Sequence, residues 1–164
     1  MMEIKLAHNE DFEQIWPVIH EVLRTGDTYP FAPDTSQKEA FHIWMEKPRA
    51  TYVAVLDDDI VGTYYIKANQ PGLGAHVCNC GYMVRRSARG KGIGRAMCLH
   101  SLREARSLGF KAMQYNLVVS TNTGAVKLWQ NLGFDIIGTL PKAFHHRKEG
   151  FVDAFVMYQW LDEQ

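Results

Sequence analysis

The chain has 164 residues, 46% of them hydrophobic, and its 18 basic residues balance its 18 acidic residues. This length suits one domain, so we expect a single domain over residues 1–164. The zero net charge argues against nucleic acid or an anionic membrane as a partner. No apolar run reaches the roughly 20 residues that a membrane helix needs, and we read no signal peptide at Met1. The three cysteines, without C-x-x-C spacing, predict a reduced, cytoplasmic protein.

Apolar periodicity and turn residues predict alternating strands and helices along the first half of the chain. In chain order these are a strand at 3–6, a helix that starts at 9–11 and ends near 23, a Gly/Pro-rich break at 24–33, a helix from 35 to 45, and a hairpin of strands 51–56 and 60–68 around three aspartates.

The second half begins with a turn at 71–74 and continues in the same alternating way. Its predicted elements are a strand at 76–84, a helix at 95–108, a strand at 112–119, a helix at 123–132, a strand at 134–140, a polar connection at 142–150 and a last strand at 152–160. The resulting order, β-α-α-β-β-β-α-β-α-β-β, predicts an α/β fold with a mixed sheet.

A basic, glycine-rich turn joins the strand at 76–84 to the helix at 95–108. Its spacing is Arg89-x-x-Gly92-x-Gly94. Glycines allow close backbone approach, and the first N–H groups of a helix have no partners within the helix, so this turn predicts an anion site. The dinucleotide motif G-x-G-x-x-G is excluded because the sixth position from Gly92 is Met97, and the P-loop is excluded because Lys91 is followed by glycine.

A second motif covers residues 122–134, where Asn122 precedes a helix that ends at Gly133-Phe134. Its apolar positions recur at helical spacing, and residues 120–122 offer capping oxygens. Together, the turn and this segment resemble the acetyl-CoA-binding motif and the downstream Asn-x-x-Ala-x-x-Leu-Tyr-x-x-x-Gly-Phe signature of the GCN5-related N-acetyltransferases. The resemblance implies a mostly antiparallel sheet with helices on both faces, splayed between its fourth and fifth strands, direct acetyl transfer from acetyl-CoA to an amine, and a homodimer as the family's habit.

The resemblance also implies the residues that bind acetyl-CoA. Backbone groups near Met83, Val84 and Arg85 would pair with the pantetheine arm, and Asn122 would reach its amides or the sulfur. Ala125 and Trp129 would lie against the coenzyme on the same helix. The pyrophosphate would lie on the N–H groups of Arg89, Gly90, Lys91, Gly92, Ile93, Gly94 and Arg95.

Two departures from the family pattern concern catalysis. Trp129 replaces a tyrosine whose phenol protonates the departing thiolate, and an indole is no acid at neutral pH. We expect Trp129 to pack against the coenzyme, and we expect Asn122, Ser120 or water to interact with the departing sulfur in place of the tyrosine. Asn79 stands where many members carry a glutamate on the central strand, and Asn116 interrupts the next strand. Both are expected to be buried, either bridging the splayed strands or holding a polar group of the acceptor.

Other candidates for the general base are His76, His145, Glu149 and Asp153, or water that relays the proton to a carbonyl. No metal site is expected, because His145-His146 has no second ligand pair and favours a solvated loop.

Segments 62–70 and 138–144, with the strand that carries Asn79, resemble fungal acetyltransferases for azetidine-2-carboxylate and other proline analogues. This resemblance implies a small amino or imino acid as the acceptor. The aromatic segment 27–31 is expected either to cover such an acceptor as a lid or to pack in the core. Two alternatives stay open: acetylation of a protein N-terminus or lysine, and a coenzyme A-binding sensor without catalysis.

Overall fold

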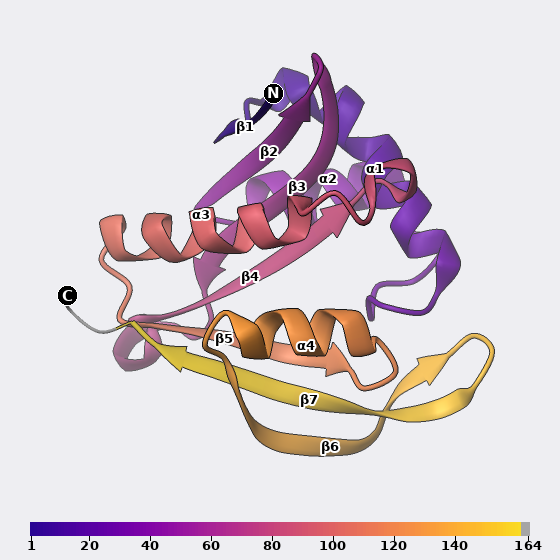
Figure 1. Cartoon of the computed structure of the whole chain (residues 1–164), viewed down its shortest axis with the longest axis vertical. Coiled ribbons are helices and arrows are strands. Elements are labelled where there is room, and N and C mark those ends of the chain that lie inside the picture. The colour runs from indigo at the N-terminus through magenta and orange to yellow at the C-terminus, as the bar shows by residue number, and fades with distance from the viewer. Residues whose placement is uncertain (162–164) are drawn as a thin grey trace.

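The computed structural model describes residues 1–161 and contains one seven-stranded sheet with helices on both faces (Figure 1). The strand order is β1-β2-β3-β4-β5-β7-β6, and every pairing is antiparallel except β4 with β5. The predicted α/β class and order of elements are therefore confirmed. The strands are β1 (Met2–Leu6), β2 (Ala50–Leu56), β3 (Asp59–Ala68), β4 (Val77–Val84), β5 (Ala112–Val119), β6 (Asp135–His146) and β7 (Gly150–Trp160).

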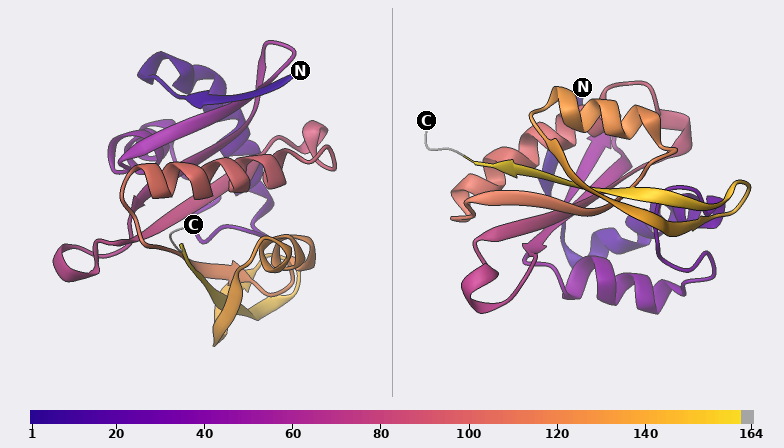
Figure 2. Two further views of the ribbon diagram at one scale, coloured as in Figure 1. Left: turned by 60° about the vertical axis from the view of Figure 1, so that its left-hand side comes forward. Right: turned by 90° about the horizontal axis from the view of Figure 1, so that it is seen from below.

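Two apolar clusters hold the helices on opposite faces of this sheet. One face carries α3 (Ile93–Ser107) and α4 (Thr123–Asn131), and the other carries α1 (Phe12–Thr25), α2 (Gln37–Phe41) and the π-helical turn His42–Glu46. The indole of Trp44, in that turn, is fully buried and donates to the Thr63 hydroxyl of β3 at 2.9 Å. Figure 2 shows in two further views how the helices cover both faces of the sheet. Within residues 1–161, no helix combines the length and apolar character that a membrane crossing requires.

The sheet divides where β4 and β5 separate. These parallel strands pair only at Val77 with Ala112 and at Cys78 with Met113, after which they diverge. The ladder between β5 and β7 is also interrupted, so that residues 116–117 of β5 have no partner on β7. The predicted splay is confirmed, and it leaves one long edge of β4 without a neighbouring strand.

The C-terminal hairpin differs from the prediction. The segment 142–150 was predicted as a polar connection, but β6 continues through it to His146, and only residues 147–149 form the turn. Lys142 takes a left-handed φ of 54°, the register shifts between Leu140 and Phe144, and the Phe144 ring is buried again beyond this bulge. The bulge lets the strand resume after Pro141. The loop prediction for His145-His146 was therefore wrong.

Candidate active site

A cavity of about 640 Å³ lies where β4 and β5 diverge. Its walls come from both strands, from the loop between α1 and α2, from the glycine-rich turn and from α4. The lining residues are Val22, Thr28–Phe31, Tyr65, Lys67, Asn79–Val84, Arg89, Gly90, Gly94, Tyr115–Val119, Asn122, Gly124, Ala125, Leu128 and Trp129. The cavity thus joins the two sequence motifs, which lie about 30 residues apart along the chain.

The glycine-rich turn forms one end of this cavity through Arg89, Gly90 and Gly94. Gly90 and Gly92 have left-handed φ values of 77° and 78°, and a Cβ built on either would meet no protein atom within 4 Å. The backbone here is therefore shaped for glycine and open to a ligand. Helix α3 begins at Ile93, two residues before the predicted start, and Gly92 caps it without a side-chain hydrogen bond. The first N–H groups of α3 have no hydrogen-bond partner within the helix, as at any helix N-terminus.

The edge of β4 that faces the gap has no neighbouring strand beyond Cys78. The Tyr29 hydroxyl lies 2.6 Å from both the backbone N–H and the carbonyl of Tyr82, so this residue faces the gap. Arg85 faces the other way, because its N–H donates to the Val61 carbonyl at 2.7 Å. By the alternation of an antiparallel ladder, Met83 also bonds to β3, while Val84 faces the gap with Tyr82. Among the three residues predicted to pair with the pantetheine arm, Val84 is the one with its backbone free toward the gap.

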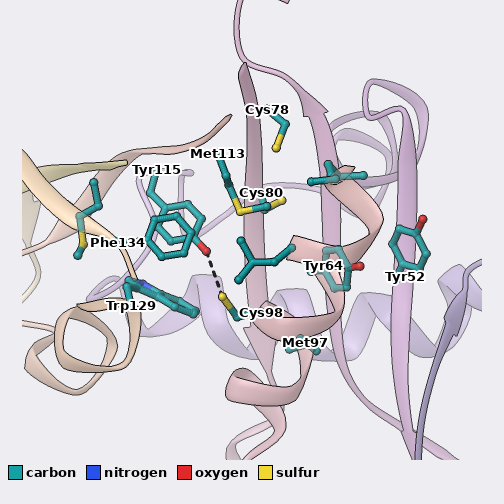
Figure 3. Packing of buried hydrophobic residues seen from close by; sticks show 14 of the residues in the cluster. Tyr52, Tyr64, Cys78, Cys80, Met97, Cys98, Met113, Tyr115, Trp129 and Phe134 are labelled. Carbon is teal, nitrogen blue, oxygen red and sulfur yellow. Dashed lines mark hydrogen bonds between the residues drawn. The ribbon is translucent and has the colours of Figure 1, made fainter. Parts of the chain in front are cut away.

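Three aromatic residues, Tyr82, Tyr115 and Trp129, line the middle of the cavity. Figure 3 shows Tyr115 and Trp129 beside each other in the core. Trp129 of α4 is buried, with its ring 5.1 Å from that of Tyr82 and 5.2 Å from that of Tyr115. The Tyr115 hydroxyl donates to the Tyr82 hydroxyl at 3.0 Å, which in turn lies 2.6 Å from Ser101 Oγ. Burial raises the pKa of both phenols well above its usual value, so both stay neutral.

Asn79 joins the two strands at the point of divergence. Its side-chain amide donates to the Gln114 carbonyl of β5 at 2.9 Å and accepts from the Tyr65 hydroxyl at 3.1 Å. Asn79 is buried, as predicted, and it also lines the cavity.

Asn116 differs from the prediction because its side chain is exposed at the rim of the cavity. It donates to Asn69 Oδ1 at 2.7 Å and accepts from Gln114 Nε2 at 3.0 Å. The interruption of the ladder at residues 116–117 turns this side chain outward, and the sequence pattern does not reveal such a bulge.

Asn122 is the N-cap residue of α4 and lines the cavity. Its side chain makes no capping hydrogen bond.

The sequence profile described as the Acetyltransferase (GNAT) family matches residues 12–134. This chain belongs to that acetyltransferase family. The structure of a GCN5-related N-acetyltransferase from Kribbella flavida superposes on it with a TM-score of 0.93, at 42% identity and 98% coverage of both chains. A phosphinothricin acetyltransferase from Sinorhizobium meliloti, solved in complex with AcCoA, shares the fold with a TM-score of 0.86 at 21% identity, over 99% of this chain and 89% of that chain.

Curated relatives of this acetyltransferase are longer proteins. N-acetyltransferase aca1 of Schizosaccharomyces pombe is 41% identical over 102 residues, which are 62% of this chain and 48% of aca1. Protein SPT10 of Saccharomyces cerevisiae is 34% identical over 83 residues, which are 51% of this chain and 13% of SPT10. The match therefore spans about half of the first relative and much less of the second.

The structure separates the predicted site residues of the acetyltransferase into two groups. All three asparagines line the cavity, as do Met83, Val84, Arg89, Gly90, Gly94, Ala125 and Trp129. Arg85, Lys91, Gly92, Ile93 and Arg95 belong to the same turn but lie beside the cavity, and the Ile93 side chain is buried in the core.

The four alternative base candidates lie elsewhere. The His76 ring contacts the Trp160 ring, the His145 ring stacks on Phe151 at 4.4 Å, and Asp153 accepts the Lys142 N–H at 2.9 Å. Neither these three residues nor Glu149 is among the lining residues found within 1–161.

Sequence reasoning missed Tyr65, Lys67, Tyr82 and Tyr115, which all line the cavity. The tyrosines occur in apolar runs and resemble core residues, and only the divergence of β4 from β5 exposes them to a ligand. Lys67 is a charged residue that directly follows the apolar run 60–66 of β3, and this sequence feature could have singled it out.

Proposed function

We propose that this acetyltransferase transfers the acetyl group of acetyl-CoA directly to the amine of a small amino or imino acid. The observation that carries the proposal is the cavity between β4 and β5, which is lined by the glycine-rich turn and by the polar residues Lys67, Asn79 and Asn116. A donor and an acceptor could meet at its middle, beside the Tyr82 backbone and Trp129.

The donor end has the chemistry that a pyrophosphate requires. The glycine backbone at 90 and 92 leaves room for phosphate oxygens, the first N–H groups of α3 supply donors, and the Arg89 guanidinium supplies positive charge. Val84 offers the backbone edge along which the amides of the pantetheine arm would pair as an added strand. These residues therefore fit acetyl-CoA as the acyl donor.

The reaction is direct, because the cavity lining formed by residues 1–161 contains no activated nucleophile. Cys80 lines the wall, but burial raises the pKa of its thiol well above the usual value, so it stays protonated. The amine nitrogen therefore attacks the thioester carbonyl carbon itself. The ammonium proton first passes to water. A C–N bond then forms and the C–S bond breaks. The nitrogen loses its second proton as the amide forms, and water carries that proton to the departing thiolate, which leaves as the thiol of coenzyme A. The three cysteines are free thiols, which supports a reducing compartment such as the cytoplasm.

The lining residues found within 1–161 include neither carboxylate nor histidine, and their charged members are Lys67 and Arg89. None of these lining residues is therefore a general base for the amine. Water would then accept the proton without a protein base.

The same charge argues against the alternative acceptors. A lysine or a basic peptide would bring further positive charge beside Lys67, whereas an amino or imino acid brings its own carboxylate. A small acceptor also suits a cavity that residues 28–31 cover from the side of α1.

Thiol release from acetyl-CoA measured with three acceptor classes tests this function. We expect the highest kcat/KM with small amino and imino acids, a lower value with amines that lack a carboxylate, and the lowest with peptides. Turnover of peptides alone would contradict the proposal that the acceptor is a small amino or imino acid. Binding of acetyl-CoA without turnover of any acceptor would favour the sensor.

A further inference from the structure

Lys67 is a cation in the cavity wall without an acidic partner. It lies near the end of β3 and is partly buried. The ion pairs formed within residues 1–161 are Met1 with Asp57 and His42 with Glu46, so neither includes Lys67. Its pKa is lowered, first by burial and then by the nearby Lys47. A side chain held in this way loses hydration and gains no counter-ion from the protein, so it favours an anionic ligand.

Neighbouring residues hold Lys67 in place. Its ammonium nitrogen lies 5.2 Å from the centroid of the Tyr65 ring, which provides a cation–π contact. Lys67 pairs in register with Asn79 of β4, and opposite residues of an antiparallel pair point to the same face. The Tyr65 hydroxyl in turn donates to Asn79 at 3.1 Å. Lys67, Tyr65 and Asn79 therefore form one polar corner, which we call the Lys67 corner.

The Lys67 corner lies at the far end of the cavity from the phosphate-binding turn. Asn79 is near the start of β4, whereas Arg89 follows its end, and the six residues from 79 to 84 alone span about 17 Å of strand. The two cations of the wall are thus well separated. Arg89 faces the donor side, and Lys67 is left for the acceptor.

We propose that the Lys67 corner is a carboxylate subsite, in which the ammonium of Lys67 binds the carboxylate of an α-amino or α-imino acid acceptor. The inference rests on the proposed function and deepens it, because it names the group on the acceptor that is recognised. Asn79 keeps one amide hydrogen for the same carboxylate after its bond to the Gln114 carbonyl. Anchoring the carboxylate positions the adjacent amine nitrogen along the gap toward the Tyr82 backbone.

The test compares acceptors that differ only in the carboxylate: L-proline, L-prolinamide and pyrrolidine. We expect the wild-type enzyme to show at least a tenfold higher kcat/KM for proline than for prolinamide, measured at saturating acetyl-CoA. Equal values for the two acceptors in the wild-type enzyme would overturn the proposal, and this comparison does not depend on any variant folding.

Two substitutions then assign the preference to Lys67. Lys67→Met removes the charge at similar volume, and we expect it to lower kcat/KM for proline by about ten- to a hundredfold, the range of a charge-assisted hydrogen bond. We expect kcat/KM for prolinamide and KM for acetyl-CoA to stay within about threefold. Lys67→Arg keeps the charge and should recover most of the preference for proline.

The matched control is Lys47→Met. Lys47 is exposed, acts on Lys67 only through its charge and lies outside the cavity lining. Lys47→Met should change kcat/KM by no more than about twofold for any of the acceptors, since exposed charges interact weakly. An equal loss for proline and prolinamide in Lys67→Met would overturn the proposal in favour of a structural role, and an unchanged value for proline would overturn it outright. Failure of the proposed function would differ, because wild-type enzyme would then turn over none of the three amines.

Discussion

At the scale of one residue, the proposed donor site depends most on Gly92. Its φ of 78° strains any residue with a Cβ, by about 1–2 kcal/mol, while the space beside it is open to a ligand. We expect Gly92→Val to bind acetyl-CoA at least a hundredfold more weakly, because the side chain fills the place of the phosphate oxygens. Isothermal titration with acetyl-CoA measures this change.

Gly109 offers a control with the same backbone strain. It has a φ of 89°, no protein atom within 4 Å of a built Cβ, and a place after the far end of α3. Gly109→Val should lose similar stability and keep its affinity for acetyl-CoA. If both variants weaken binding equally, the turn acts through folding and is not the phosphate site.

Trp129 decides whether this enzyme needs an acid for the thiolate. General acid catalysis contributes about 10²- to 10⁴-fold in rate. If the indole only packs against Tyr82 and Tyr115, Trp129→Phe should lower kcat by less than about tenfold and the free energy of unfolding by about 1–2 kcal/mol. Steady-state kinetics and urea unfolding measure the two effects. A folded variant with kcat reduced more than a hundredfold at unchanged KM would show a catalytic role for the indole.

At the scale of elements, the fit between β3 and β4 shapes the acceptor end. Gly81 lies opposite Tyr65, and a Cβ built on it would come within 2.7 Å of the Tyr65 ring. Gly81→Ala should therefore displace this ring, cost about 1–3 kcal/mol of stability and raise KM for the acceptor more than for acetyl-CoA.

Gly138 of β6 is the matched control, because it also lies in a strand and a Cβ built on it meets nothing within 4 Å. Gly138→Ala should leave stability and both KM values nearly unchanged. Equal KM shifts for acceptor and acetyl-CoA in Gly81→Ala would contradict the assignment of this corner to the acceptor. Thermal unfolding and steady-state kinetics distinguish these outcomes.

At the scale of the whole molecule, the sequence predicted the order of elements and the glycine-rich turn between β4 and α3, because both depend on local patterns. Glycines at 90, 92 and 94 and the periodic helix after Asn122 are visible without knowledge of contacts. The acceptor end depends on register between strands. Only the pairing of Lys67 with Asn79 and the interruption of β5 at Asn116 determine which polar side chains meet, and no local pattern specifies either.

The stability of the whole domain should also depend on pH through His100 of α3. Its Nδ1 lies 2.6 Å from the Tyr64 hydroxyl, and its pKa is lowered by burial, with Glu104 opposing and Arg103 adding to the shift. Because the folded state then binds fewer protons than the unfolded state, stability should fall as the pH drops through about 6.5 toward the folded pKa.

Urea unfolding between about pH 7 and about pH 5 checks this dependence. His100→Gln can still accept a hydrogen bond from Tyr64 without titrating, so it should lose less stability than the wild type over this range. If the free energy of unfolding falls equally with pH in the wild type and in His100→Gln, His100 does not contribute to the pH dependence of stability.

The central claim is that donor and acceptor meet in the gap between β4 and β5. A crystal structure of the enzyme with acetyl-CoA tests it most directly. We predict the pyrophosphate at the turn of residues 89–95, the pantetheine arm along Val84, and the thioester beside Tyr82 and Trp129, with the Lys67 corner left to the acceptor. Acetyl-CoA bound outside the gap, or with its thioester directed away from Asn79, would contradict the account.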